Sequence, residues 1–367
     1  MSAHHLYIHV PFCTRKCSYC DFAIAVRRVV PVDDYLRGIA SELSRLPTGA
    51  AGALETVYLG GGTPSRLGAL GIARLLELVR ERFDVTPDAE ITIEANPEDI
   101  SAESTAAWAR AGINRLSIGI QSFDDDVLRW MHRVHNSADS VRAIGDARAG
   151  GIENLSVDLI FALPSQLSRA WQSDLERTLY LEPDHISLYG LTIEPATPIA
   201  RWQERGEVVP ANEDLYAEEF LLADEMASAS GYRHYEVSNF ARPGKESRHN
   251  SAYWSGASYL GVGPSAHSYD GESRTWNVAA YTEWLQRLDA GDATKRDEER
   301  LTADNRASER VYLGLRTAGG FHAAGSDLDK AKGWTSAGWA SIEDDVVRLT
   351  PEGWLRLDSL AAGLTGF

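Results

Sequence analysis

Residues 6–20 read LYIHVPFCTRKCSYC, which joins a short apolar stretch to three closely spaced cysteines. The stretch 6–10 is mostly apolar and partly β-branched, as expected of a buried strand. The cysteines follow with the spacing Cys13-x3-Cys17-x2-Cys20, so that one loop can wrap three thiolates around one metal centre. The chain has no other cysteine, which excludes a disulfide framework and fits a reducing compartment. This stretch therefore predicts a strand that leads directly into a metal-binding loop.

The number of cysteines bears on which metal the loop holds. Three ligands suit a [4Fe–4S] cluster with one open iron, because an electron-transfer ferredoxin would bring a fourth cysteine. An open iron can be chelated by the amino and carboxylate groups of a small molecule. The alternative is a zinc site in which His9 completes a set of three cysteines and one histidine with Cys13 and its neighbours. Arg15 and Lys16 are expected to lower the pKa of the thiols, which favours either metal.

Strand and helix patterns alternate through the first half of the chain. Further strands are predicted at 56–59, 91–95, 115–120, 155–160 and 185–191, and helices at 32–46, 67–83, 102–111, 139–149 and 168–181. Ser101 is a good N-cap, but Ser104 stands where a capping box usually has Glu, so we expect an incomplete box. Such alternation implies a parallel sheet with right-handed crossovers. Six units fall short of the eight of a complete barrel, so we predict an open, partial (β/α)6 barrel, with a doubly wound sheet as the alternative.

The amino-acid composition of the chain changes after about residue 240. Residues 240–280 are rich in Gly, Ser, Tyr and Trp and are expected to be irregular but packed. A helix at 308–315, a strand at 346–350 and a helix at 351–360 predict a small C-terminal α+β domain, winged-helix-like in type. The expected division is 1–235 for the α/β barrel with its N-terminal cysteine loop, 236–290 for a connecting region and 291–367 for the C-terminal domain.

Composition limits the class of protein. Hydrophobic residues make up 44% and charged residues 24% of the 367 residues, as in globular proteins. Lys and Arg total 36 against 53 Asp and Glu, a formal net charge of −17 that repels phosphate backbones and argues against nucleic-acid binding. No apolar run approaches the roughly 20 residues of a membrane-spanning helix, and the N-terminus lacks a signal-peptide pattern. A cytoplasmic location is therefore expected.

Several polar or glycine residues stand at the predicted carboxyl ends of strands, where parallel α/β folds bind ligands. The run Gly60-Gly61-Gly62-Thr63-Pro64 lets a ligand approach the backbone closely, although a plain tight turn would have the same letters. Glu94 and Gln121 end the next strands. Asp158 lies inside an apolar run, where the alternative is a salt bridge or a backbone hydrogen bond in the core. Together they predict one binding mouth beside the cysteine loop, which a zinc site does not require.

The cysteine spacing with Tyr7 six residues before it, the GGGTP turn, Glu94, Gln121, Arg133 and Asp158 resemble the radical S-adenosylmethionine family. The similarity is strongest to the branch that contains the oxygen-independent coproporphyrinogen dehydrogenases (HemN) and the heme chaperones (HemW). It implies that Cys13, Cys17 and Cys20 hold the cluster. It also implies that S-adenosylmethionine contacts Gly61, Gly62, Thr63, Glu94, Gln121, Arg133 and Asp158, with Tyr7 and Tyr19 at matching positions. An electron from the cluster would then cleave the sulfonium to a 5′-deoxyadenosyl radical.

Two features favour the chaperones over the dehydrogenases. The dehydrogenase pattern has a further cysteine two residues after the triplet, where this chain has Phe22. The dehydrogenases also carry a long arm before the cluster, whereas the first cysteine here is Cys13. A radical heme chaperone is therefore expected, with an oxygen-independent coproporphyrinogen III oxidase in porphyrin biosynthesis and a zinc-stabilised structural protein as alternatives. No catalytic residue is assigned, and whether S-adenosylmethionine is cleaved in turnover is left open.

The segment 248–254 fits the chaperones as well, because that group carries an HNxxYW motif linked to heme. His249 is the expected axial ligand of heme, with Tyr253 and Trp254 as flat surfaces against the macrocycle. The alternative is that His249 and Asn250 bond the loop backbone while the aromatic rings fill a domain junction. His267 is a second candidate ligand. The expected partners are heme-acceptor proteins and a low-potential electron donor such as flavodoxin or ferredoxin, and peripheral membrane association and a homodimer are kept open.

Overall fold

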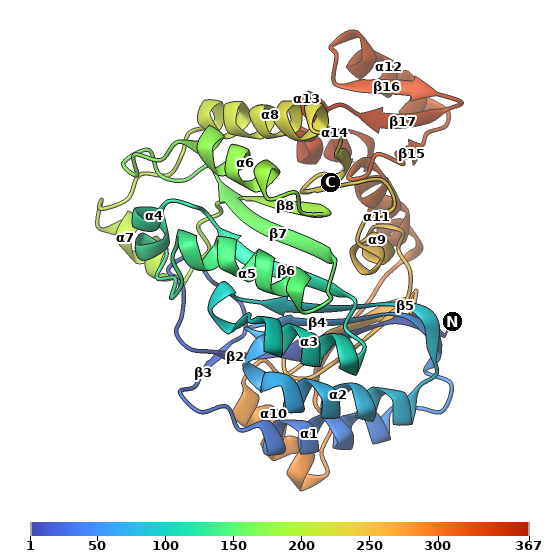
Figure 1. The fold of residues 1–367 in the computed structure, drawn as a ribbon. Helices are drawn as coiled ribbons and strands as arrows, with labels where there is room; N and C mark the ends of the chain where they lie inside the picture. Colours follow the sequence, from blue (N-terminus) through green and yellow to red (C-terminus); the bar gives the residue numbers. More distant parts are fainter. Residues whose placement is uncertain (1, 366–367) are drawn as a thin grey trace.

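Six parallel strands form the centre of one large sheet and follow one another in the sheet in chain order. The structure is a computed structural model and describes residues 2–365 (Figure 1). The central strands are β1 (Ala3–Val10), β4 (Ala51–Gly61), β5 (Val85–Ala95), β6 (Arg115–Gln121), β7 (Asn154–Phe161) and β8 (His185–Gly190). This order confirms the partial (β/α)6 barrel and excludes the doubly wound sheet, whose strand order reverses.

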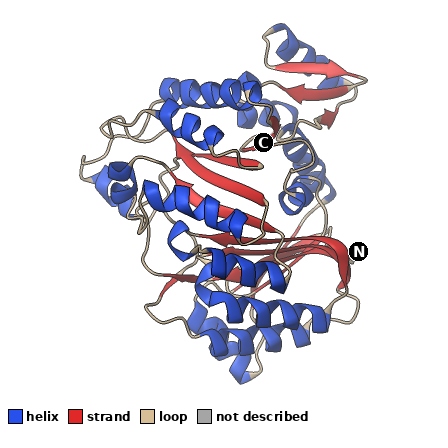
Figure 2. Ribbon diagram, viewed as in Figure 1, coloured by secondary structure: helices blue, strands red, loops and turns tan. Residues whose placement is uncertain are grey.

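Helices connect these strands or follow the last of them; most cover the outside of the curved sheet, whereas the short α4 and α7 lie beyond the strand ends (Figure 2). They are α1 (Val32–Arg45), α2 (Gly68–Arg82), α3 (Ala102–Ala111), α4 (Asp125–Trp130), α5 (Ser137–Ala149), α6 (Trp171–Tyr180), α7 (Pro198–Glu204) and α8 (Glu213–Ala229). In α1 the apolar residues Tyr35, Ile39 and Leu43 recur every four positions, so they share one face, and all three are buried. The core lies between this helical layer and the sheet.

The sheet continues sideways beyond both outer strands of the parallel set, β1 and β8. On one side β11 (Tyr259–Val262) pairs in parallel with β1, and β12 (His267–Tyr269), β13 (Ser273–Asn277) and β14 (Lys295–Arg300) follow in antiparallel pairs. On the other side β10 (Asn239–Ala241) and β9 (Arg233–Glu236) extend the sheet from β8. The expectation of irregular structure over 240–280 is therefore wrong. Strands of three to five residues are too short to show an alternating pattern.

One buried carboxylate joins the first helix to elements more than 200 residues later. Glu42 of α1 accepts hydrogen bonds from the Gly263 backbone N–H at 2.8 Å, Asn277 Nδ2 at 2.5 Å, Trp284 Nε1 at 3.0 Å and Thr294 Oγ1 at 3.1 Å. Trp284 belongs to α10 (Tyr281–Ala290), which packs against α1. Burying a carboxylate is costly unless its lone pairs are used, and here four donors use them.

The C-terminal part is small and mixes helices with strands, as predicted. Its elements are α11 (Ala303–Leu315), β15 (Phe321–His322), α12 (Ser326–Ser336), β16 (Ala340–Glu343), β17 (Val346–Leu349), α13 (Pro351–Trp354) and α14 (Leu357–Thr365). The strands form an antiparallel sheet in the order β15-β17-β16. This part begins at α11 rather than at residue 291, because β14 belongs to the large sheet. None of the described helices is long and apolar enough to cross a membrane.

Candidate functional site

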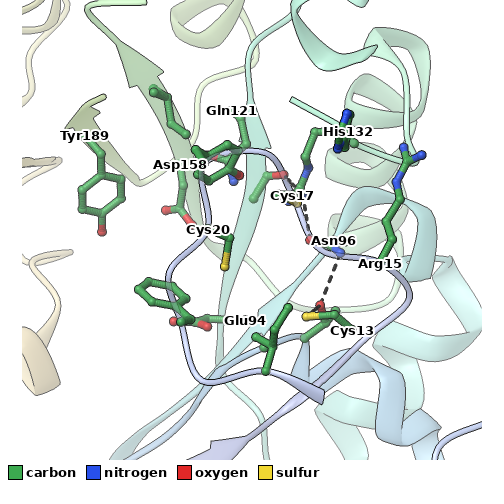
Figure 3. A pocket seen from close by; sticks show the side chains of 18 of the residues that line it. Cys13, Arg15, Cys17, Cys20, Glu94, Asn96, Gln121, His132, Asp158 and Tyr189 are labelled. Atoms are coloured by element: carbon green, nitrogen blue, oxygen red, sulfur yellow. Dashed lines mark hydrogen bonds between the residues drawn. The ribbon is translucent and has the colours of Figure 1, made fainter. Parts of the chain in front are cut away.

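A cavity of about 410 Å³ opens at the carboxyl ends of the parallel strands (Figure 3). It gathers most of the residues that the sequence singled out, namely Cys13, Cys17, Tyr19, Cys20, Gly61, Gly62, Thr63, Glu94, Gln121, Arg133 and Asp158. These residues come from the cysteine loop, from the ends of β4 to β7 and from the segment after α4. Since parallel strands place their carboxyl ends on one rim, the topology explains the convergence.

The cysteine loop hangs between β1 and α1 and is fixed at both ends. Its first cysteine, Cys13, closes β2 (Phe12–Cys13), which pairs with β3 (Ala25–Val26). In the middle of the loop the buried Ser18 donates its backbone N–H to Met131 O at 3.1 Å. All three cysteines are unpaired and half-buried, so their sulfur atoms are available to a metal centre at the cavity rim.

Burial makes the thiols of Cys13 and Cys20 weaker acids. It raises the pKa of Cys13, although a hydrogen bond with Thr63 Oγ1 at 3.5 Å opposes the shift. It raises the pKa of Cys20 to about 11. Binding of a metal centre to these two cysteines as thiolates must therefore release protons.

The two basic residues of the loop do not act as the sequence suggested. Arg15 and Lys16 are exposed, and the positive charges that lower the pKa of Cys13 against its burial come from Arg133 and Arg66. The expectation that Arg15 and Lys16 set the thiol pKa is therefore wrong. Their exposed charges instead surround the loop on its solvent side.

The donor set fits a cluster better than a zinc ion. Both ring nitrogens of His9 are engaged, Nδ1 with Tyr7 Oη at 3.2 Å and Nε2 with Ala23 O at 2.9 Å. Within residues 2–365 no group of three or more His, Cys, Asp and Glu side chains is arranged to hold a single metal ion. A [4Fe–4S] cluster does not need such convergence, because each thiolate binds a different iron. The geometry argues against the zinc alternative built on His9.

The glycine turn is hydrogen-bonded to the carboxylate of Glu94. The backbone N–H of Gly61, which has φ of 110°, donates to Glu94 Oε2 at 3.1 Å, and Tyr58 Oη donates to Glu94 Oε1 at 2.9 Å. A Cβ at Gly62 would lie 2.7 Å from the Pro11 carbonyl carbon, so only glycine fits there. Burial raises the pKa of Glu94 to about 7, which makes this carboxyl titratable near neutral pH.

Arg133 also lines this cavity and lies beside a cysteine. Its Nη2 donates to Asn96 Oδ1 and to Gly119 O, both at 2.7 Å, and Nη1 lies 3.7 Å from Cys17 Sγ. Its buried Nε has no hydrogen-bond partner among the described residues. The sequence reasoning missed Asn96, although this residue follows Glu94 by two positions at the same strand end.

The inner wall carries a second carboxylate. Ser117 Oγ donates to both oxygens of Asp158 at 3.1 Å, and burial raises the pKa of Asp158. Neither the ion pair nor the backbone hydrogen bond considered as an alternative forms within the described chain. Gln121 has a φ of 69°, a left-handed conformation that is uncommon outside glycine and concentrates at functional sites. Tyr189, at the end of β8, also lines the cavity and was missed.

The two predicted tyrosines lie in different places. Tyr19 lines the first cavity, whereas Tyr7 does not. Tyr7 stacks on Tyr58, with ring centroids 6.1 Å apart, and lines a second cavity of about 970 Å³. The geometry does not support a contact between Tyr7 and a ligand in the first cavity.

The second cavity adjoins the first, and the two share Asp21, Phe22, Gly61 and Glu94. Phe22, which occupies the position of the additional cysteine in the dehydrogenase pattern, is 62% exposed. An exposed phenylalanine at the junction offers an apolar surface to ligands on either side.

His249 is not available as an axial ligand in this structure. The side chain is 1% exposed, Nδ1 is 2.6 Å from Thr56 Oγ1, and Nε2 is 2.8 Å from Tyr253 Oη. Its backbone N–H donates to Glu90 Oε1 at 3.0 Å. Burial lowers the pKa of His249 to about 3. The prediction of heme ligation by His249 gains no support from this geometry, in which α9 (Arg248–Trp254) uses His249 to attach Tyr253 to the barrel.

Comparison with known proteins places these features in context. The model of the radical SAM superfamily matches residues 7–176. The chain is 36% identical to the heme chaperone HemW of Mycobacterium tuberculosis, over 98% of this chain and 94% of that protein. It is 35% identical to HemW of Bacillus subtilis, over 86% and 83%. Among solved structures, the coproporphyrinogen III oxidase HemN of Escherichia coli matches with a TM-score of 0.83 and 24% identity over 98% of this chain and 89% of that one, a likeness of fold.

Proposed function

This chain belongs to the HemW family of the radical SAM superfamily, and from that premise we propose that it binds a [4Fe–4S] cluster, S-adenosylmethionine and heme and delivers heme to acceptor proteins. The observation that carries the proposal is the convergence of three unpaired cysteines and the strand-end polar residues on one cavity, with a larger cavity next to it. The first cavity suits a small polar molecule beside a cluster, and the second suits a larger ligand.

The residues of the first cavity have different roles, which follow from the chemistry of their side chains. Cys13, Cys17 and Cys20 hold the cluster. When bound, a cluster with an open iron supplies a coordination position for an amino acid group and an electron for a sulfonium. Glu94, held by the Gly61 turn, offers a carboxylate to the amino group of S-adenosylmethionine.

On the other walls, Asp158 and Gln121 offer acceptors and donors to ribose hydroxyls. Arg133 places a positive charge near the carboxylate of S-adenosylmethionine, and it already lies against Cys17. All three side chains are held by the strand ends or by the segment after α4, so they are positioned before a ligand arrives.

The second candidate function is the oxidative decarboxylation of coproporphyrinogen III. The likeness of fold to HemN is the reason to consider this function. Phe22 favours the chaperone, because an apolar side chain stands at the junction of the two cavities where the dehydrogenases have a cysteine.

An electron donor must approach the cluster loop, and the charge at that loop suggests its type. Arg15, Lys16 and Arg28 are exposed there, on a chain whose net charge is −17. Arg66 donates from Nη1 to Thr14 Oγ1 at 2.7 Å and so adds a positive charge to the same rim. We propose that an acidic, low-potential donor such as flavodoxin or ferredoxin docks on this rim, steered by charge.

The test is anaerobic reconstitution followed by two parallel assays. We expect bound iron and sulfide, a shift of the Soret band when hemin is titrated, and no vinyl product from coproporphyrinogen III, with a dehydrogenase as the working control. Zinc without sulfide would refute the cluster, and a missing Soret shift would refute heme binding. Formation of the vinyl product at the rate of the control would establish the dehydrogenase instead.

A further inference from the structure

The second cavity has two facing walls of different character. One wall is the face of β12 and β13 that carries His267 and Tyr269, residues two apart on one strand and therefore on one side of the sheet. The other wall is α11, whose residues Arg306, Arg310 and Leu313 recur at helical spacing. The cavity volume of about 970 Å³ lies at the upper end of the range of ligand pockets.

From this arrangement we propose, on the basis of the function proposed above, that heme binds in the second cavity with His267 coordinating its iron and with Arg306 and Arg310 pairing with its two propionates. The cargo would then lie directly beside the cavity assigned to S-adenosylmethionine.

His267 has ring nitrogens that are accessible for coordination. Two histidines line this cavity, His9 and His267, and both ring nitrogens of His9 are already engaged. His267 is exposed, and neither of its ring nitrogens forms a hydrogen bond within residues 2–365. Its ring stacks on Trp276 at a centroid distance of 5.7 Å and an interplanar angle of 20°, which restricts its orientation. Desolvation by the surrounding protein and the charge of Arg274 lower the pKa of His267, which favours the neutral ring.

Two arginines on α11, Arg306 and Arg310, are available to pair with a dicarboxylate. Arg274 is already paired with Glu309 through two hydrogen bonds of 2.6 and 2.9 Å. Arg306 donates only to the carbonyl oxygen of Leu301, at 2.7 Å, and the exposed Arg310 forms no hydrogen bond or ion pair with the described residues. Arg306 and Arg310 lie one helical turn apart on the same face, as two neighbouring propionates require.

The remaining surface suits a flat apolar macrocycle. Tyr253 and Tyr259, which pack edge to face with ring centroids 4.7 Å apart, line the cavity together with Trp254 and Tyr269. The acidic residues Asp21 and Glu94 line the end that the two cavities share, away from α11. The charges therefore favour the propionates at α11 over the junction of the two cavities.

The experiment is a hemin titration of the reconstituted protein, followed by the Soret band and by electron paramagnetic resonance of the ferric form. We expect His267→Ala to lower hemin affinity by at least about tenfold and to change the resonance signature of the axial ligand. Added imidazole should restore that signature in His267→Gly. The control is His322→Ala, an exposed histidine outside the cavity, which should bind hemin like the parent chain.

The arginines are tested with a matched ligand. Arg306→Gln combined with Arg310→Gln should weaken hemin by about tenfold or more but leave hemin dimethyl ester, which lacks both charges, unchanged. If the parent chain binds no hemin, the proposed function fails and this site with it. If the parent binds hemin but the His267 variants keep its affinity and signature, or the arginine variants weaken both ligands equally, the site is overturned while heme binding stands.

Discussion

Replacing Glu94 by Gln should separate the ionised from the protonated form of the carboxyl at the glycine turn. The amide keeps the shape, since its oxygen can accept from the Gly61 N–H and its NH2 can donate to Tyr58 Oη in reversed roles. What the variant loses is the negative charge. A hydrogen bond to a charged group contributes about 1.5–3 kcal/mol, so at pH 8 we expect S-adenosylmethionine to bind the variant about 10- to 100-fold more weakly.

The pH dependence gives the sharper test. With the pKa of Glu94 at about 7, most of the protein is ionised at pH 8 and about a tenth at pH 6. If the ionised form is the binding form, affinity of the parent chain falls by about tenfold over that interval. The assay is equilibrium binding of S-adenosylmethionine to anaerobically reconstituted protein at both pH values, expressed as the ratio of parent to variant, which cancels titration of the ligand itself. A ratio that stays constant between pH 6 and pH 8 would refute the role given to Glu94.

Three further outcomes are expected from the same structure. A raised carboxyl pKa contributes stability at low pH, and this stability is lost as the pH rises toward 7. The stability of Glu94→Gln relative to the parent should therefore be about 1–2 kcal/mol higher at pH 8 than at pH 5 in thermal unfolding, a modest value because the side chain faces a cavity. An equal difference at both pH values contradicts this. Glu42→Gln should destabilise by about 3 kcal/mol or more, since either orientation turns an NH2 toward two donors, whereas the exposed Glu77→Gln should change the melting temperature little. Gly62→Ala should impair cluster reconstitution because its Cβ would overlap the Pro11 backbone, while Gly333→Ala, which meets open space in a helix, should be neutral or stabilising by up to about 1 kcal/mol; normal iron content in the former would be evidence against the tight turn.

Much of the first cavity could be predicted because one rule of parallel sheets places it. Gly61, Glu94 and Asp158 were selected for standing at strand ends or within a strand, and the rim of the barrel brings them together. The same rule, applied to every strand, would also have selected Asn96 and Tyr189. Their signal is weaker, because an amide or a phenol costs less to bury than a carboxylate in an apolar run.

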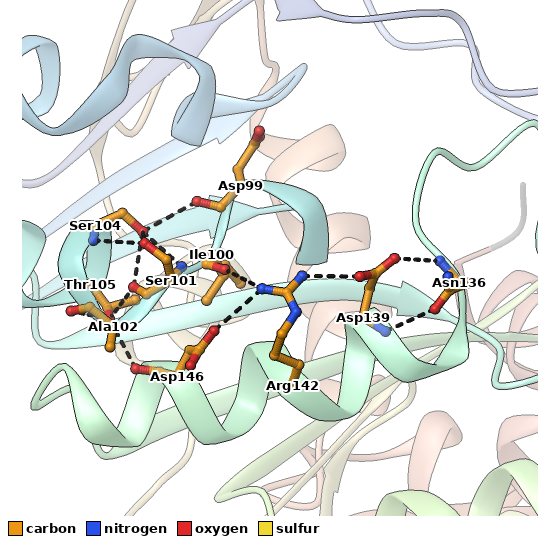
Figure 4. Close-up of polar contacts among 10 residues, drawn as sticks. All are labelled: Asp99, Ile100, Ser101, Ala102, Ser104, Thr105, Asn136, Asp139, Arg142 and Asp146. Carbon is orange, nitrogen blue, oxygen red and sulfur yellow. Dashed lines mark hydrogen bonds and ion pairs between the residues drawn. The ribbon is translucent and has the colours of Figure 1, made fainter.

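Local hydrogen bonding was harder to predict than topology. At the start of α3 the capping box is complete, because Ser101 Oγ accepts from Ser104 N at 3.1 Å and Ser104 Oγ accepts from Ser101 N at 2.9 Å (Figure 4). The hydroxyl of a serine thus replaces the longer Glu. Arg142 of α5 adds a bond to Ile100 O at 3.2 Å and so ties α5 to the turn before this cap, a pairing over 42 positions that no local pattern reveals.

His249 shows the limit of motif reasoning. A histidine in a heme-linked motif predicts a ligand, but whether its nitrogens are free depends on Thr56, which is 193 positions away in the chain. The exposed His267 had the weaker sequence signal and has the free ring. Burial and partners decide between such candidates, and both are properties of the folded chain.

The position of β1 has a consequence for how the protein is made. β1 pairs with β4 on one side and with β11, which ends at Val262, on the other. Until that point of synthesis is passed, one edge of β1 stays open in the growing chain, next to the cysteines that follow it. Such an edge is a template for wrong pairing, so a partly synthesised chain can mispair at this strand. We therefore expect the cysteine loop to reach its final setting only after β11 has been synthesised and has paired with β1.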